Sequence, residues 1–155
     1  MDSVEMFLAH AVKLEQEAAE RFGQLADAMT SAGNRDVGAL FRRLSDYSRL
    51  HLSDAKARAG FRDLPKLAAS EFVWPDLESP EVAAIWAADP QLGREDALRI
   101  ALDAERAGLE YYRRVYHETR EPEIKALAKE FSEEEEAHVA ELEKWLAARS
   151  VNSIG

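Results

Sequence analysis

The chain has 155 residues, of which 46% are hydrophobic and 32% charged, so we expect one soluble globular domain over residues 1–155. Its net charge of −10 disfavours nucleic acid and anionic membranes as partners, and the absence of cysteine excludes disulfides, thiol catalysis and cysteine-ligated zinc or iron–sulfur centres. Because no apolar run resembles a signal peptide or is long enough to span a bilayer, the sequence predicts a cytoplasmic location.

Two amphipathic helices are predicted in the first sixty residues. The first begins near Asp2 or Ser3, either of which is a suitable N-cap, and ends before Gly33, while the second ends near Gly60. Apolar residues at steps of three and four place one stripe of each helix towards a core. The stripes are Leu8, Ala11, Glu15, Ala18, Phe22, Leu25 and Met29 in the first helix, and Val37, Leu40, Leu44, Ser48, His51 and Ala55 in the second.

Residues 60–93 have a different composition, with four prolines and several aromatic residues. Ser79 followed by Pro80 is typical of a helix start, so a short helix is predicted to about Ala88. A segment this long is not a tight turn. We expect an ordered crossover that lies against the other helices and is anchored by its aromatic side chains.

Two further long helices are predicted after the crossover. The third starts near Gly93, and the fourth starts at Glu121-Pro122 and runs to about Arg149, followed by a frayed tail over 150–155. Their stripes are Leu98, Ala101, Glu105, Gly108, Tyr112 and Val115, then Leu127, Phe131, Glu135, His138, Leu142 and Trp145. Four long helices with short loops and one long central connection predict an all-α four-helix bundle with a crossover between helices two and three.

Ionisable residues interrupt these apolar stripes at repeated positions. The first and third helices carry Glu15 and Glu105, and the second and fourth carry His51 and His138. Glu135 lies three residues before His138, which gives a Glu-x-x-His pair on the fourth helix. The two halves of the chain therefore align almost without gaps, and each contributes a core-facing glutamate and a core-facing histidine at the same depth.

The repeated pattern predicts a metal site. A buried carboxylate is unfavourable unless it is neutralised, and the inward stripes carry no lysine or arginine. Two ferrous or manganous ions lying close together need anionic oxygen ligands, bridging carboxylates and terminal imidazoles. We therefore predict five metal ligands; a salt-bridged core is the alternative interpretation of the same residues. The predicted ligands are Glu15, His51, Glu105, Glu135 and His138.

With this ligand pattern on four helices, residues 4–148 resemble the rubrerythrin-type members of the ferritin-like di-iron superfamily. The resemblance implies a ferritin-like bundle with one or two iron ions, and the oxidation of ferrous iron or the reduction of hydrogen peroxide. By position, Glu15 and Glu105 correspond to the lone glutamates and Glu135 to a bridging ligand with His138 terminal. His51 corresponds to the remaining part of the second Glu-x-x-His pair.

The sequence departs from the family pattern in three respects. Ser48 replaces the other bridging glutamate, Gly108 replaces an additional glutamate of the third helix, and the cysteine-ligated rubredoxin-like domain is missing. A redox-active chain would therefore need an external electron donor. Zinc or manganese in place of iron, and a degenerate ferritin-like scaffold with a partial metal site and a structural or partner-binding role, are the alternative hypotheses. A homodimer through an exposed helical face is also expected.

A few other ionisable or aromatic residues lie on or near the four helices that carry the stripes. Glu134 is a candidate substitute ligand, although a surface position is the first interpretation. Tyr47, Tyr111 and Tyr112 are expected to pack near the site with satisfied hydroxyl groups. His10 and His117 lie off the stripes and are predicted to be exposed.

Overall fold

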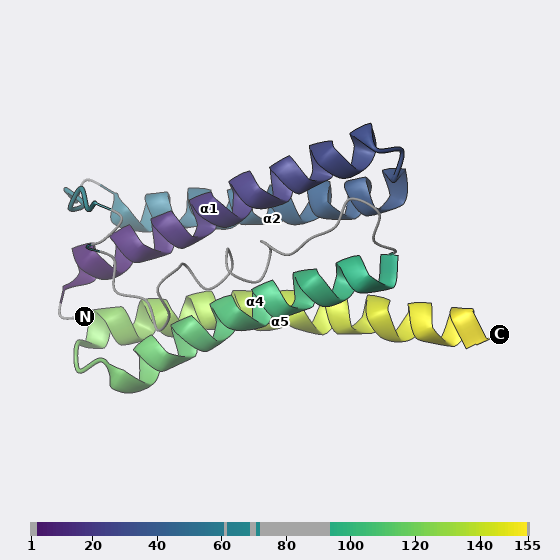
Figure 1. Cartoon of the computed structure of the whole chain (residues 1–155). Coiled ribbons are helices and arrows are strands. Elements are labelled where there is room, and N and C mark those ends of the chain that lie inside the picture. The colour runs from purple at the N-terminus through teal and green to yellow at the C-terminus, as the bar shows by residue number, and fades with distance from the viewer. Residues whose placement is uncertain (1–2, 61, 69–70, 72–93, 155) are drawn as a thin grey trace.

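The computed structural model describes residues 3–60, 62–68, 71 and 94–154, and consists of four long helices. These are α1 (Val4–Ser31), α2 (Arg35–Ala59), α4 (Arg94–Glu118) and α5 (Pro122–Ile154). Helices α1 and α2 form one helical hairpin, and α4 and α5 form a second hairpin that packs against it (Figure 1). The predicted all-α bundle is confirmed. Most of the predicted crossover over 60–93, including the short helix from Ser79, lies outside the described residues.

Local sequence determines where the first hairpin starts and turns. Ser3 caps α1, because its hydroxyl accepts a hydrogen bond from the backbone N–H of Met6 at 3.0 Å. At the other end Gly33 adopts φ +86°, which favours glycine. This conformation lets the N–H groups of Gly33 and Asn34 donate to the carbonyls of Thr30 and Met29, at 3.0 and 2.8 Å. The turn therefore reverses the chain directly into α2.

Two apolar clusters fill the bundle, one towards each end. The first contains Phe22, Phe41 and Leu98 among others, and the second contains Phe7 and Phe131. Along each helix, the buried glutamates and the histidines of the stripes fall between the residues of the two clusters. The polar side chains thus form a layer in the middle of the bundle, covered by hydrophobic packing on both sides.

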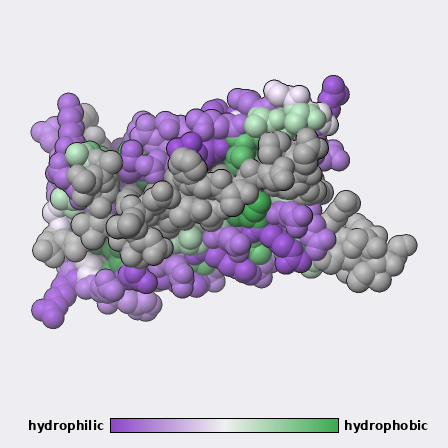
Figure 2. All heavy atoms as spheres, viewed as in Figure 1, coloured by the Kyte–Doolittle hydropathy of each residue, from purple (hydrophilic) through white to green (hydrophobic). Residues whose placement is uncertain are grey.

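The outer surface of the helices is mainly hydrophilic on the face shown in Figure 2, and hydrophobic residues are visible mostly between the two helical layers. Among the described helices, none has both the length and the apolar composition required to cross a membrane. A hydrophilic outer surface with hydrophobic residues between the layers is typical of helices that pack against each other through their apolar stripes.

Two sequence-based expectations require correction. His10 is buried, with 0% of its surface exposed, and its Nδ1–H donates to the carbonyl of Met6 at 2.8 Å. Its neighbours Ala9 and Ala11 are also buried, so this part of α1 is enclosed on more than one stripe. Helix α5 extends to Ile154 and not to about Arg149, because no glycine or proline follows Pro122 until Gly155. The predicted tail over 150–155 is therefore helical as far as Ile154.

Gly38 allows a close approach of α2 to α1, so Gly38→Ala should destabilise the protein. An added Cβ would meet the Thr30 side chain and come within 3.1 Å of the Ala26 carbonyl oxygen, which belongs to the helical backbone. We expect a loss of about 1–3 kcal/mol in the free energy of unfolding, measured by urea denaturation.

Gly23→Ala is the matched control for this prediction. Its added Cβ would lie 3.4 Å from Ser45 Oγ, at ordinary contact distance. The gain in helix propensity should then leave stability unchanged or raise it by up to about 1 kcal/mol. Equal stabilities of the two variants would show that the helices do not cross closely at Gly38.

Candidate metal centre

All five predicted ligands lie in the middle layer of the bundle, and each of α1, α2, α4 and α5 contributes at least one of them. The glutamates are almost completely enclosed: the exposed fractions of Glu15, Glu105 and Glu135 are 3%, 2% and 1%. The side chains of His51 and His138 are exposed by 13% and 16%. The helical spacing of the stripes thus directs five side chains from α1, α2, α4 and α5 to one region.

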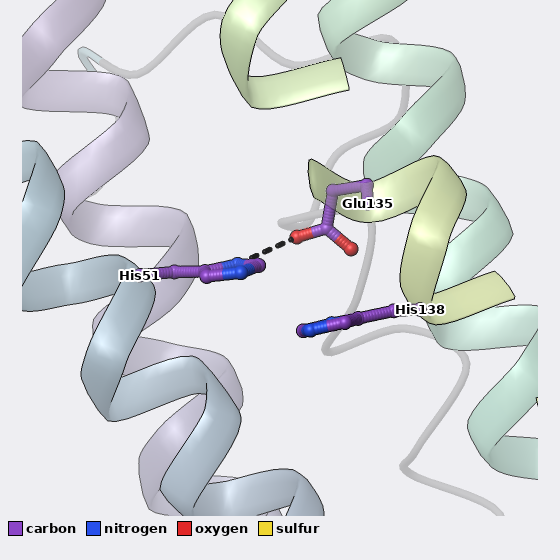
Figure 3. A group of neighbouring side chains, drawn as sticks. All are labelled: His51, Glu135 and His138. Atoms are coloured by element: carbon purple, nitrogen blue, oxygen red, sulfur yellow. Dashed lines mark hydrogen bonds and ion pairs between the residues drawn. The ribbon is translucent and has the colours of Figure 1, made fainter. Parts of the chain in front are cut away.

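A group of three residues forms the centre of this region. His51 on α2 faces Glu135 and His138 on α5, and each residue offers a ligand atom within 4.8 Å of the others (Figure 3). His51 Nδ1 lies 3.2 Å from Glu135 Oε1. The two imidazole rings stack with their centroids 4.6 Å apart and an angle of 8° between their planes. A nitrogen–oxygen set of this size could hold a metal ion.

Each histidine also faces the lone glutamate of its own half of the chain. His51 Nδ1 lies 3.7 Å from Glu15 Oε1, and His138 Nδ1 lies 3.9 Å from Glu105 Oε2. The structure therefore brings together all five residues that the sequence singled out. They form two similar pairs, His51 with Glu15 and His138 with Glu105. Glu135 lies next to His51 and belongs to the same group as His138.

Aromatic side chains surround the five residues. Tyr112 donates a hydrogen bond from its hydroxyl to Glu15 Oε1 at 3.2 Å, and Tyr47 packs on the ring of His138 with centroids 4.7 Å apart. Tyr111 is buried beside Tyr112, and burial raises the pKa of its hydroxyl. The expectation that tyrosines pack near the site therefore holds, and the Tyr112 hydroxyl bonds to one of the predicted ligands.

The charges of the site influence one another. Burial disfavours protonation of His51, but the nearby carboxylates of Glu15, Glu134 and Glu105 outweigh it and raise its pKa. For Glu105, burial opposes ionisation, but its interactions with Glu135, His138 and His51 dominate and lower its pKa. Without a metal ion, Glu105 and Glu135 are therefore two buried carboxyl groups that influence each other's ionisation.

A cleft leads from the surface to this region. It contains Glu134, whose carboxylate Oε2 lies 3.8 Å from His51 Nε2. Burial, followed by the negative charges of Asp54, Glu130 and Glu15, raises the pKa of Glu134 above its ordinary value, against the opposing effect of His51. The residues lining the cleft are Glu15, His51, Ala55, Tyr112, Phe131 and Glu134.

The sequence signal for Glu134 was weak, because it stands in a run of four glutamates next to the predicted ligand Glu135. Two other positions matter because they lack a carboxylate. Ser48 is 3% exposed, and Gly108 is also buried, so both face the interior without contributing a charge. Helix α2 therefore contributes no carboxylate to the site, and α4 contributes only that of Glu105.

The donor set fits a divalent metal ion. It combines carboxylate oxygens with two imidazoles and contains no sulfur, which is a set that iron, manganese and zinc accept. In the described part of the chain, the ion pairs of Glu15 and Glu105 are made with histidines and not with lysine or arginine. A cation would therefore offset buried negative charge that basic side chains do not offset here.

Comparison with known proteins gives one informative match. The sequence matches no protein-family model and no curated protein. It is similar to an uncharacterized conserved protein from Magnetospirillum magnetotacticum MS-1, described as COG1633, whose crystal structure superposes with a TM-score of 0.72. The two chains share 38% sequence identity over 94% of this chain and 95% of that one. The chain therefore belongs to the COG1633 family, with the fold of a ferritin-like four-helix bundle.

Proposed function

We propose that the chain is a metal-binding protein that holds one or two divalent ions, iron foremost, in the middle of its bundle. The ligands would be the five residues Glu15, His51, Glu105, Glu135 and His138. The observation that carries the proposal is the group of His51, Glu135 and His138, whose ligand atoms lie within 4.8 Å of one another in a buried layer. The pairing of each histidine with a further buried glutamate supports it.

With iron bound, we propose a rubrerythrin-like oxidoreductase activity towards ferrous iron, oxygen or peroxide. Bound ferrous iron would supply the electrons for reducing oxygen or peroxide. The protein would supply anionic ligands in a site shielded from bulk water, and Tyr112 would orient Glu15 through its hydroxyl group. The chain contains no cysteine, so a separate protein or small molecule would have to return the electrons.

Metal analysis tests the binding proposal directly. Protein produced in iron-supplemented medium, or titrated with Fe²⁺ under anaerobic conditions, should retain at least one equivalent of metal after desalting. Retention of less than about a tenth of an equivalent of any transition metal would contradict the proposal, because the affinity of such sites normally survives gel filtration. Reoxidation of the ferrous protein by hydrogen peroxide then tests the activity.

A second function is favoured by the two uncharged inward positions. Ser48 and Gly108 leave the site with fewer carboxylates than a symmetrical pair of metal positions would use. Under this proposal the chain is a ferritin-like scaffold with a partial metal site and a structural or partner-binding role, and zinc or manganese would serve as well as iron. Rapid, stoichiometric reoxidation of the ferrous protein by peroxide would exclude this second function.

Metal affinity should depend on pH through His51. The raised pKa of this histidine means that its ring stays protonated to a higher pH than usual, and the bound proton competes with a metal ion. The affinity should therefore fall by up to about tenfold per pH unit as the pH drops through the His51 pKa, and level off above it. Titrations with Mn²⁺ between pH 5.5 and 8 measure this dependence. A flat profile over that range would show that no proton is displaced from the site.

A further inference from the structure

We propose that a second metal ion binds in the cleft, on the outer side of His51, through His51 Nε2 and Glu134. This inference rests on the proposed metal-binding function and specifies where the second ion lies. It assigns a ligand role to Glu134, a residue outside the five that the repeated sequence pattern identifies. The inner ion would then be bound by Glu105, Glu135 and His138.

The first step is the tautomer of His51. Its Nδ1 lies 3.2 Å from Glu135 Oε1, and a carboxylate oxygen at this distance accepts a hydrogen bond, so Nδ1 carries the proton in the neutral ring. The lone pair of the neutral ring is therefore on Nε2. This nitrogen faces Glu134 and not Glu135, which directs the coordinating capacity of His51 towards the cleft.

The second step is the distance between His51 Nε2 and Glu134 Oε2, which is 3.8 Å. This is too long for a hydrogen bond. Two donor atoms that bind the same ion at about 2.0–2.2 Å are separated by roughly 3.0–3.6 Å, depending on the coordination angle. The two atoms are therefore already close to the spacing of neighbouring ligands, and a small side-chain movement would complete the geometry.

The third step is the space between the side chains. Glu15, His51 and Glu134 all line the same cleft, where Glu134 lies next to His51 Nε2 and Glu15 Oε1 lies 3.7 Å from His51 Nδ1. The Glu134 side chain is 33% exposed, so an ion could reach it from solvent. Ser48 offers no carboxylate on the α2 side, and Glu134 of α5 would contribute the additional negative charge from the opposite hairpin.

Cobalt titration of purified, metal-free protein tests the proposal. Co²⁺ is used because its visible absorption reports the coordination of each equivalent. The wild type should bind two equivalents, and Glu134→Gln should bind one, with the second equivalent weakened at least tenfold. Glutamine retains an amide oxygen that accepts a hydrogen bond, so a residue that merely positions His51 would tolerate this change. The matched control is Glu133→Gln, at an exposed position on the same helix, which should bind two equivalents.

The outcomes separate this proposal from the proposed function. Two equivalents bound by Glu134→Gln with unchanged affinity, or a single equivalent bound by both proteins, would overturn the cleft site while leaving the inner site intact. A wild type that binds no cobalt, manganese or iron would instead overturn the proposed function and the cleft site together. Circular dichroism of each variant verifies that the bundle is folded before titration.

Discussion

Glu135→Gln is expected to lower the affinity for the first metal ion by at least about 100-fold, because even the residues that only support metal ligands typically contribute 10–100-fold. Glu135 is 1% exposed, and it is the carboxylate in the group that also contains both histidines. Glutamine has nearly the same shape but no charge, so it would replace a strong anionic ligand with a weak one. Anaerobic titration with Fe²⁺ or Mn²⁺ measures the loss.

The same variant distinguishes a metal site from a salt-bridged core. If Glu135 serves only to pair with protonated histidine, its replacement should destabilise the metal-free protein by about 3–5 kcal/mol. If it is a metal ligand, the metal-free variant should be as stable as the wild type or more stable, since one of the neighbouring buried carboxylates has lost its charge. A metal concentration that just saturates the wild type should then raise the melting temperature of the wild type more than that of the variant.

Glu133→Gln controls for a general effect of charge. Glu133 is exposed two residues before Glu135, on the opposite side of the helix, so this change should alter neither metal affinity nor stability by a measurable amount. Retention of wild-type affinity by Glu135→Gln would remove Glu135 from the ligand set. The sign of the stability change would then decide between a structural role and no role for this carboxylate.

The fold was predictable from the sequence because each helix carries a regular stripe and a clear boundary. Ser3, Gly33 and Pro122 mark helix ends in the sequence, and the structure places ends beside all three. The central positions of the stripes, such as Glu15 and Glu105, are buried as the period of 3.6 residues requires. These features depend only on local sequence and on one amphipathic face per helix.

Other features depend on how neighbouring helices surround a residue, which a single stripe does not describe. His10 lies off the predicted stripe, yet it is enclosed, because the start of α1 is packed on more than one side. Glu134 is adjacent to a buried residue and belongs to an acidic run, so only the cleft beside His51 distinguishes it from Glu133. Similarly, the direction in which each His51 nitrogen points is a property of the packed bundle.

Phe7→Ala is expected to cost about 3–5 kcal/mol, which is a large fraction of the stability of an ordinary domain. Phe7 is completely buried on α1, and it stacks on Phe131 of α5 with ring centroids 5.9 Å apart. It also meets Tyr112 of α4 edge-on at 6.2 Å. One side chain of the first hairpin thus contacts both helices of the second, and its removal leaves a cavity between them. Urea denaturation of the metal-free protein measures the loss.

The comparison with Phe22→Ala makes the prediction specific to the contact between the hairpins. Phe22 is equally buried, but its stacking partner is Phe41, which belongs to the same hairpin, at 6.0 Å. Both variants should lose stability, but only Phe7→Ala should also weaken metal binding, because Phe131 and Tyr112 line the cleft beside Glu15 and His51.

Phe7→Leu, which keeps most of the volume, should cost less than about 1.5 kcal/mol. A loss below about 1 kcal/mol for Phe7→Ala would mean that the hairpins are not held together through this residue.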